Sequence, residues 1–287
     1  MVYLLGVAAA ALLAVGFVIQ HHAAEEEPPS LRLSYRLLVH LAARRKWLLG
    51  IAAMIAGQIA GAAALSRGPV ALVEPLLAAN LLFALPLTAL YHRRRLRAVD
   101  VAGAFVLIAG LALFVSTGRP HGGSPHRTNA TAWAAAFGAL AVALVVLLVA
   151  QRRRSATATA ILLGIGAGLV FGMQDTLTQG VDRVASHGIS AFFSSWMPYV
   201  LLAAGATGLL LAQSAFEAAP LSASLPAITA AEPLAGIALG IGLYRERVST
   251  SPLALAGETL GLAAVVCGIV IVGRSPVVTG QHRWRSG

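Results

Sequence analysis

Nine apolar stretches, each long enough to cross a lipid bilayer, are the feature that most constrains what this chain can fold into. An α-helix needs about 20 apolar residues, each rising 1.5 Å, to cross the hydrocarbon core. Hydrophobic residues make up 58% of the 287 residues and charged residues 11%, whereas a soluble domain carries about 25% charged residues. The sequence therefore predicts an all-α, polytopic membrane helical bundle. The predicted spans are Tyr3–Gln20, Trp47–Leu65, Val70–Tyr91, Val101–Thr117, Ala132–Ala150, Thr159–Leu177, Ser195–Gln213, Leu221–Tyr244 and Pro252–Val272.

Positive charges between the spans predict the orientation of the chain. The net charge of +10 arises from 21 Lys and Arg against 11 Asp and Glu. Such a balance can indicate nucleic-acid binding, but here the arginines form short tracts between spans, so we expect no nucleic acid. Fifteen of the 21 fall on one side and six on the other, and the side with fifteen should be cytoplasmic. We therefore expect a multi-pass protein of the plasma (inner) membrane, with its N-terminus outside, its C-terminus inside and residues 274–287 as a cytoplasmic tail.

The segment between the first two spans has its own pattern. Basic side chains recur every fourth residue, at Arg32, Arg36, His40 and Arg44. Leucines occupy the opposite helical face, at Leu33, Leu37, Leu38 and Leu41. This pattern predicts an amphipathic helix over residues 31–45 that lies in the plane of an anionic membrane surface. The alternative is a degenerate tenth span.

The span Leu221–Tyr244 carries an acid and a proline near its middle, at Glu232 and Pro233. A carboxylate at that depth costs about 2.5–3.5 kcal/mol on insertion scales. Pro233 donates no backbone hydrogen bond, so the carbonyl of Thr229 needs another partner. A span with a helix break and an acid at one point is typical of an ion or substrate site. The alternative is a proline kink in which Glu232 is protonated or paired for packing.

An internal repeat links the two halves of the chain. Glu74-Pro75-Leu76 recurs as Glu232-Pro233-Leu234, and Leu4-Leu5-Gly6 recurs as Leu162-Leu163-Gly164 at the same offset. We expect a first repeat over residues 1–117, a linking span over 132–150 and a second repeat over 158–273, all within one transmembrane domain, residues 1–287. Because a single span, an odd number, separates two copies of four spans, the second copy is inverted in the membrane. Inverted repeats are common in secondary transporters. Pro75 and Pro233 would be the equivalent helix breaks.

Polar residues inside the spans predict a path across the membrane. Near the midplane we place Glu232, Gln58 and Asn80; in the outer third Glu74, Asp175 and Glu258; towards the cytoplasm Gln213 and Glu217. Acids without a matching intramembrane Lys or Arg favour a cationic substrate or a proton, and burial can raise the pKa of a carboxylic acid by up to about 3–5 units. The alternatives are that the outer acids are merely solvated at the headgroups and that the glutamines only bridge helices.

Small residues at four-residue spacing predict close helix contacts. They occur at Gly57 and Gly61, at Gly164, Gly168 and Gly172, at Gly236 and Gly240, and at Gly257 and Gly261. Because glycine provides 29 of the 287 residues, each motif alone indicates packing and not function.

No enzyme motif is present, so neither a catalytic residue nor a cofactor is expected. The single cysteine, Cys267, lies inside a span, which excludes a disulfide framework and a cysteine metal site. His21 and His22 are adjacent, so they should not share a helical face. With Glu25–Glu27 they could bind a metal weakly, but a solvated loop is the favoured interpretation, and no metal site is predicted.

Several motifs resemble those of the drug/metabolite transporter superfamily. They are Gln213-Ser214-Ala215-Phe216, Ala219-Pro220-Leu221, Ala231-Glu232-Pro233-Leu234 and Leu243-Tyr244-Arg245-Glu246-Arg247, with Gly68-Pro69, Glu74-Pro75-Leu76 and Leu82-Phe83-Ala84-Leu85-Pro86 in the first half. The nearest branches are the EamA-like permeases and the nine-span, NIPA-like magnesium transporters. The chain departs from the pattern where Gly-Glu-Arg is usual, and the second of ten usual spans is reduced to residues 31–45.

The resemblance implies an alternating-access permease for a small cationic or amphipathic solute, with its site near Glu232 and Glu74 as the repeat partner. Expected partners are a small-molecule or ion substrate and the lipid bilayer, and a homodimer is allowed. Two alternatives stay open: a divalent-cation transporter of the NIPA-like kind, and a non-transporting membrane scaffold.

Overall fold

The chain folds into a bundle of long helices. The computed structural model describes residues 1–65, 67, 73, 76–91, 97–118, 129–245, 249 and 251–273, and these contain no strand. Eight described helices are long and apolar enough to cross a membrane. They are α1 (Val2–Glu25), α3 (Arg45–Leu65), α6 (Ala98–Gly118), α7 (Ala130–Ala150), α8 (Ala156–Ser186), α10 (Met197–Ala218), α11 (Leu221–Tyr244) and α12 (Pro252–Gly273). The predicted class, a polytopic helical membrane protein, is confirmed.

Four shorter helices complete the described chain. They are a 3-10 turn η1 (Pro29–Leu31), α2 (Tyr35–Ala42), α5 (Asn80–Tyr91) and α9 (Ile189–Ser194). The apolar helix of α5 extends back to Leu76 and corresponds to the predicted third span. Glu74 and Pro75, which the sequence placed at its start, lie outside the described residues, as does the predicted tail 274–287.

Predicted and observed spans differ most at α8. The sequence predicts Thr159–Leu177, but the helix runs on to Ser186 and contains 31 residues. At 1.5 Å per residue it is about 46 Å long, whereas the hydrocarbon core is about 30 Å thick. Its polar last turns remain helical because they pack: Gly180 lies against Met197 of α10. Helix α8 is therefore longer than the hydrocarbon core is thick, and its C-terminal turns extend beyond that core.

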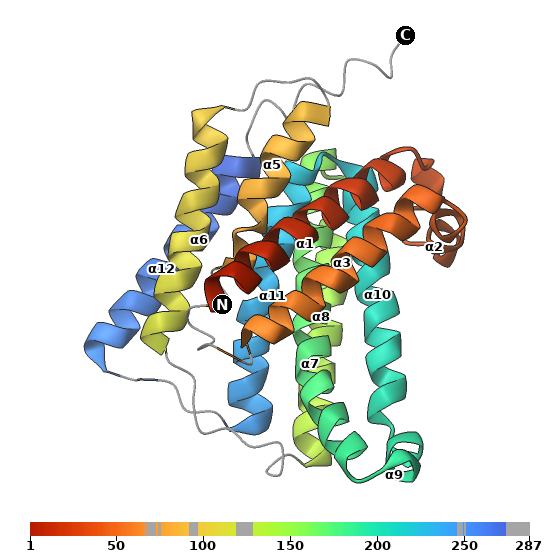
Figure 1. Ribbon diagram of the computed structural model, residues 1–287, viewed down its shortest axis with the longest axis vertical. Helices are drawn as coiled ribbons and strands as arrows, with labels where there is room; N and C mark the ends of the chain where they lie inside the picture. The colour runs from red at the N-terminus through yellow and green to blue at the C-terminus, as the bar shows by residue number, and fades with distance from the viewer. Residues whose placement is uncertain are drawn as a thin grey trace.

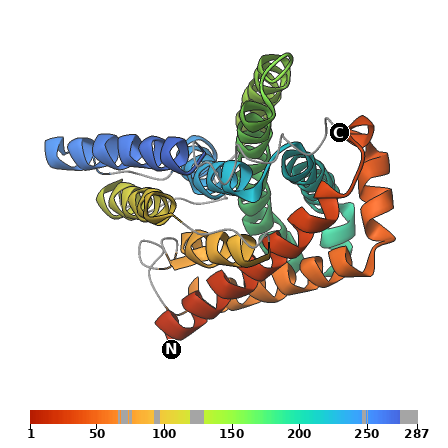
Figure 2. The same ribbon diagram turned by 90° about the horizontal axis from the view of Figure 1, so that it is seen from above.

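The helices pack in antiparallel and parallel pairs. Figures 1 and 2 agree that α1 lies beside α3 and that α6 lies beside α12. On the other side of the bundle α8 packs against both α10 and α11. The C-terminal ends of α1, α5 and α10 lie at one end of the bundle, together with the beginning of α3. Ring stacking joins α1 to α5, and hydrogen bonds join α1, α3 and α10. Helix α11 begins at the same end and contacts α1 and α10. This end of the bundle carries Arg32, Arg36, Arg44, Arg45, Lys46 and Arg97, and we call it the arginine-rich end.

Glycines bring α8 very close to α11. A Cβ atom added to Gly164 would lie 2.8 Å from the carbonyl oxygen of Ser224, and one at Gly168 would lie 2.9 Å from the backbone nitrogen of Glu232. At Gly172 the nearest atoms, the Cβ of Ala235 and the carbonyl oxygen of Glu232, would be 2.6 Å away. The predicted glycine face of α8 is therefore a packing face, and it lies along the stretch of α11 that contains Glu232.

Two further helix pairs use the same device. Gly110 of α6 and Gly261 of α12 each approach the other's carbonyl oxygen, at 2.7 Å from an added Cβ. Gly57 and Gly61 of α3 face α1 and the Leu77 side chain, as their spacing predicts. Gly236 differs, because an added Cβ there would meet no atom within 4 Å. The backbone nitrogen of Gly236 lies 2.8 Å from a Cβ added at Gly172, so Gly236 takes part in the contact with α8 through its backbone, while its own Cβ position is open.

Helix α2 is shorter than the predicted amphipathic helix over residues 31–45. It begins after Ser34, whose hydroxyl accepts a hydrogen bond from the Arg36 backbone nitrogen. Its apolar side chains Leu37 and Leu41 are fully buried, and α2 packs against α10 and α3. Two of the four predicted leucines thus contact protein, whereas Leu33 is exposed and Leu38 is half-buried, and the placement of this helix in the plane of a membrane surface stays a prediction.

Gly172→Ala should destabilise the protein, whereas Gly138→Ala on α7 should stabilise it slightly. An added methyl at Gly172 collides with the backbone of α11, and overpacking of this kind costs about 1–3 kcal/mol. Gly138 has no atom within 4 Å of an added Cβ, so alanine there gains about 0.5–1 kcal/mol of helix propensity. Thermal unfolding of the two variants in detergent measures the difference. Equal melting temperatures would contradict the close contact between α8 and α11.

Candidate functional site

The centre of α11 combines an acid with a proline inside a membrane-spanning helix. The helix continues without interruption through Pro226 and Pro233. The predicted break therefore takes the form of a missing backbone hydrogen bond, because Pro233 cannot donate to the carbonyl of Thr229. Glu232 is half-buried, while Ala231 and Ala235 beside it are buried against α8. The carboxyl group thus leaves the backbone next to the close contact between α8 and α11.

Asn80 on α5 lies at a depth comparable to that of Glu232. Asn80 lies eleven residues before Tyr91, the last residue of α5, and Glu232 lies eleven residues after Leu221, the first residue of α11. Both of these helix ends are at the arginine-rich end, so each residue lies about 16 Å from it at 1.5 Å per residue. Asn80 is only 5% exposed, and its Oδ1 atom accepts no hydrogen bond within the described part of the chain. Helices α5 and α11 contact each other, and α5 also contains an internal proline, Pro86. These two residues are the predicted midplane groups that the structure keeps inside the bundle.

The other predicted polar residues differ in burial. Gln58 is exposed on α3, because Gly57 faces α1 and the next residue is rotated by about 100° around the helix. Asp175 is exposed on α8. Glu258 is half-buried near Gly118, and its Oε1 atom has no hydrogen bond within the described residues. Glu74 lies outside the described residues, and the polar path across the membrane stays a prediction.

Gln213 belongs to a buried chain of hydrogen bonds at the arginine-rich end. Its side chain is fully buried. Its Oε1 atom accepts from Trp47 Nε1 at 3.1 Å, and its Nε2 atom donates to Gln20 Oε1 at 2.6 Å. Gln20 in turn donates to the Met54 sulfur at 3.1 Å. These bonds join α1, α3 and α10, as the helix-bridging alternative for Gln213 expected. Gln20 and Trp47 were not predicted as functional residues, because the sequence shows each of them only as a polar group at the end of an apolar run.

Glu217 forms an ion pair with an arginine that precedes α2. Arg32 Nε donates to Glu217 Oε2 at 2.6 Å, with side-chain exposures of 27% and 2%. The neighbouring Leu33 adopts a left-handed backbone, with φ at 58°, and its backbone nitrogen donates to Ser214 Oγ at 3.0 Å. Because αL geometry costs an L-residue about 1–2 kcal/mol, these two contacts with α10 hold Leu33 in an unfavourable conformation.

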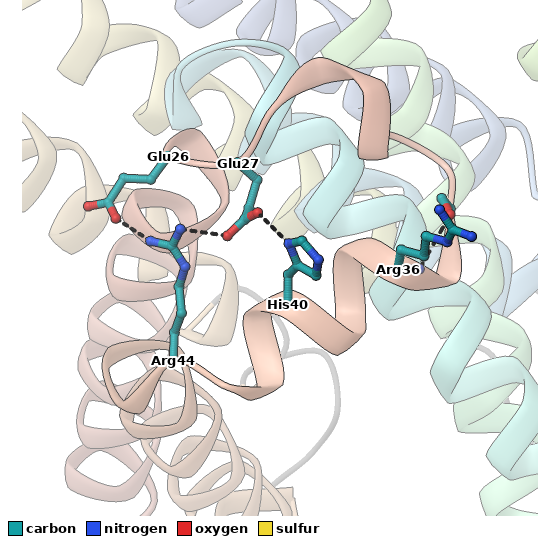
Figure 3. Close-up of polar contacts among 6 residues, drawn as sticks. Glu26, Glu27, Arg36, His40 and Arg44 are labelled. Atoms are coloured by element: carbon teal, nitrogen blue, oxygen red, sulfur yellow. Dashed lines mark hydrogen bonds and ion pairs between the residues drawn. The ribbon is translucent and has the colours of Figure 1, made fainter.

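A second group of ion pairs ties α2 to the end of α1. Arg44 contacts both Glu26 and Glu27, the latter at 2.7 Å, and His40 Nδ1 lies 3.4 Å from Glu27 (Figure 3). Glu27 is 3% exposed. Arg32 and Arg44 are thus used inside the protein. Of the basic face predicted at residues 31–45, Arg36 and His40 are exposed, and its direction towards an anionic membrane surface stays a prediction for these two residues.

Two described cavities are apolar. The larger, about 440 Å³, lies between α7, α8 and α11 and is lined by side chains such as Ala136, Leu169, Met173, Ala238 and Leu239. The smaller, about 290 Å³, lies between α1 and α5. Glu232 lines neither of these two cavities. The larger cavity begins one turn beyond Glu232, at Ala235, so it offers an apolar surface next to the acid.

The fold defines the class of this protein as a multi-pass helical membrane protein. The chain is similar to an uncharacterized protein of Corynebacterium glutamicum, with 26% identity over 282 residues that cover 98% of this chain and 97% of the relative. No family model matches the chain, and no solved structure matches it. The similarity extends over nearly the whole of both chains and is not limited to one motif.

Arg32→Ala should destabilise the protein more than Glu217→Gln. Removing the arginine leaves a buried carboxylate unpaired, which costs about 3 kcal/mol. Glu217→Gln keeps a neutral group in the buried position, and the partly exposed arginine can reach water, so the cost should be about 1 kcal/mol. Thermal unfolding in detergent measures both, and the double variant should recover part of the loss of Arg32→Ala. If Arg32→Ala proves no worse than Glu217→Gln, the pair does not stabilise this end of the bundle.

Proposed function

We propose that this protein is a secondary transporter that moves a small cationic or amphipathic solute by alternating access, with its working centre at Glu232. The observation that carries the proposal is the half-buried carboxyl group beside Pro233 in the middle of α11. An ionisable group inside a membrane span is costly and usually marks an ion or substrate site. The adjacent apolar cavity would suit the hydrocarbon part of an amphipathic solute.

The pairing of helices supports an inverted repeat. In the first half α1 packs against α3 and α5, and in the second half α8 packs against α10 and α11. The third and fourth helices of each half also contact each other: α5 with α6, and α11 with α12. The two halves meet through contacts between α6 and α12 and between α5 and α11. Helices α1 and α10 bring their C-terminal ends together, with Gln20 beside Gln213, whereas α8 runs antiparallel to α10, with Gly180 beside Met197 and Gly208 beside Phe171. The first helices of the two halves therefore run in opposite directions, as inverted repeats require.

Under this proposal residues 1–117 and 158–273 form the two repeats, and α7 is the linking span. The side chains of α7 agree with a peripheral role, because Trp133 is its one buried residue. Glu74 would be the repeat partner of Glu232, and Asn80 would contribute an amide from α5 at a similar depth.

We propose that the protein lies in the plasma membrane. Because positively charged ends face the cytoplasm, the arginine-rich end should be on the cytoplasmic side. If the shorter α5 crosses the membrane as the eight long helices of the described residues can, the chain makes nine crossings, and the N-terminus should be outside and the C-terminus inside. Reporters that are active only in the cytoplasm, fused to either end, should give a signal at the C-terminus alone. A cytoplasmic signal from the N-terminal fusion would contradict nine crossings.

A second candidate function is that of a membrane scaffold that does not transport. The packing around α11 favours it, because Gly168 and Gly172 leave little space against the backbone of Glu232 and the two described cavities are apolar. In that case Glu232 would serve packing alone. A divalent-cation transporter of the NIPA-like kind is a variant of the first proposal and would use the same acid.

Glu232→Gln should abolish transport without preventing insertion. The amide keeps the volume of the side chain and is easier to bury than a carboxylate, but it cannot titrate or neutralise a cation. Uptake of ethidium and of Mg²⁺ into everted vesicles, measured at several pH values, separates an organic cation from a divalent ion. The matched control is Asp182→Asn, an exposed acid near the far end of α8.

At equal expression, wild type and Asp182→Asn should accumulate one of the two probes above the level of empty vesicles, and Glu232→Gln should not. Transport by Glu232→Gln at the wild-type rate and with the wild-type pH response would remove Glu232 from the working centre. Absence of accumulation in all three, for both probes, would favour the scaffold.

A further inference from the structure

Three potential metal ligands converge on the last turn of α1. His21, His22 and Glu25 each offer one ligand atom, and these atoms all lie within 4.8 Å of one another. The nearest oxygen of Glu25 is 3.8 Å from His21 Nε2 and 3.8 Å from His22 Nδ1. Glu25 follows the histidines by four and three residues, which places its carboxylate between the two rings on the helix surface. Adjacent histidines on a helix were predicted to diverge, but here the Glu25 carboxylate lies 3.8 Å from both rings.

Neighbouring helices fix both imidazole rings. His21 is fully buried and packs edge-on against Phe216 of α10, with ring centroids 6.1 Å apart. His22 stacks on Tyr91 of α5, with centroids 3.5 Å apart. Side-chain exposure rises from 1% for His21 to 11% for His22 and 35% for Glu25. The three groups thus form a site that is closed on the protein side and open at the carboxylate.

We propose that His21, His22 and Glu25 bind a divalent transition-metal ion such as Zn²⁺. Two imidazole nitrogens and one carboxylate oxygen are ligands that zinc and its neighbours accept, with a further position left for water. Ligand distances of about 2.0–2.2 Å put neighbouring ligand atoms about 3.4 Å apart in a tetrahedral site. The two separations from Glu25 are 3.8 Å, and the ligand atoms of the two histidines lie within 4.8 Å of each other, so metal binding must draw the three groups closer together.

The surroundings favour a cation and select its type. The site lies at the C-terminal end of a 24-residue helix, where the helix dipole attracts positive charge. Mg²⁺ and Ca²⁺ prefer sites built from oxygen ligands, so two imidazoles argue against them. Because these ligands are distant in sequence and position from Glu232, the site does not depend on the transport proposal. The competing interpretation is an ion pair between Glu25 and a protonated histidine, which needs no metal.

The test uses the purified full-length protein in detergent, carrying no histidine tag, and Co²⁺ as a spectroscopic probe. Wild type should bind one equivalent of Co²⁺ with d–d absorption in the visible range, and Zn²⁺ should displace it. Glu25→Gln and His22→Ala should each weaken binding at least about tenfold. Both side chains are partly exposed, so these variants should fold. His187→Ala, an exposed histidine at the end of α8, is the matched control and should bind as wild type does.

Thermal unfolding gives a second readout. Zn²⁺ should raise the melting temperature of wild type and of His187→Ala but not of Glu25→Gln, because a ligand that binds only the folded state stabilises it. The proposal is overturned if wild type binds no stoichiometric Co²⁺, or if Glu25→Gln and His22→Ala bind it as tightly as wild type. Displacement of Co²⁺ by an equal concentration of Mg²⁺ would also overturn the assignment to a transition metal.

Discussion

The close contact between α8 and α11 is the constraint on which the centre of this bundle depends. Between helices in lipid there is no hydrophobic driving force, so association relies on packing and on hydrogen bonds. Gly164, Gly168 and Gly172 remove side chains from one face of α8 and let it approach the backbone of α11. This contact fixes the rotation of α11, and it thereby determines that Glu232 leaves the helix beside the contact and not within it.

The arginine-rich end is held together in a different way, by polar groups that neutralise one another. Gln213 links α10 to α1 and α3 through hydrogen bonds, and Glu217 binds Arg32 at the beginning of the segment that contains α2. Glu27 receives Arg44 from the other end of that segment. Any motion that opens this end of the bundle must separate α10 from α1, and it therefore has to break buried polar contacts. The segment between α1 and α3 therefore links the ends of α1 and α10 through these two ion pairs.

Hydropathy predicted the helices well because span length depends on bilayer thickness. The predicted eighth span, Leu221–Tyr244, coincides with α11, and the glycine spacing of α8 indicated its packing face. Rotation about each helix axis was harder to predict, because spans that are apolar on all sides carry no periodic signal. Gln58 was expected inside and is exposed, whereas Gln20 was not considered and is buried. The arginines before and after α2 were assigned to lipid because their acidic partners, Glu217 and Glu27, are not recognisable as partners from spacing alone.

The proposed alternating access requires that the middle of α11 becomes accessible from each side of the membrane in turn. Gly236 lies one turn beyond Glu232, and a Cβ added there meets no atom of another helix within 4 Å. A cysteine introduced there, in a chain in which Cys267 is replaced by serine, should fit without disturbing the helix. We predict that a membrane-impermeant thiol reagent labels this cysteine when applied from either face, in separate experiments. Labelling from neither face, or from one face only under all conditions, would contradict alternating access at the centre of α11.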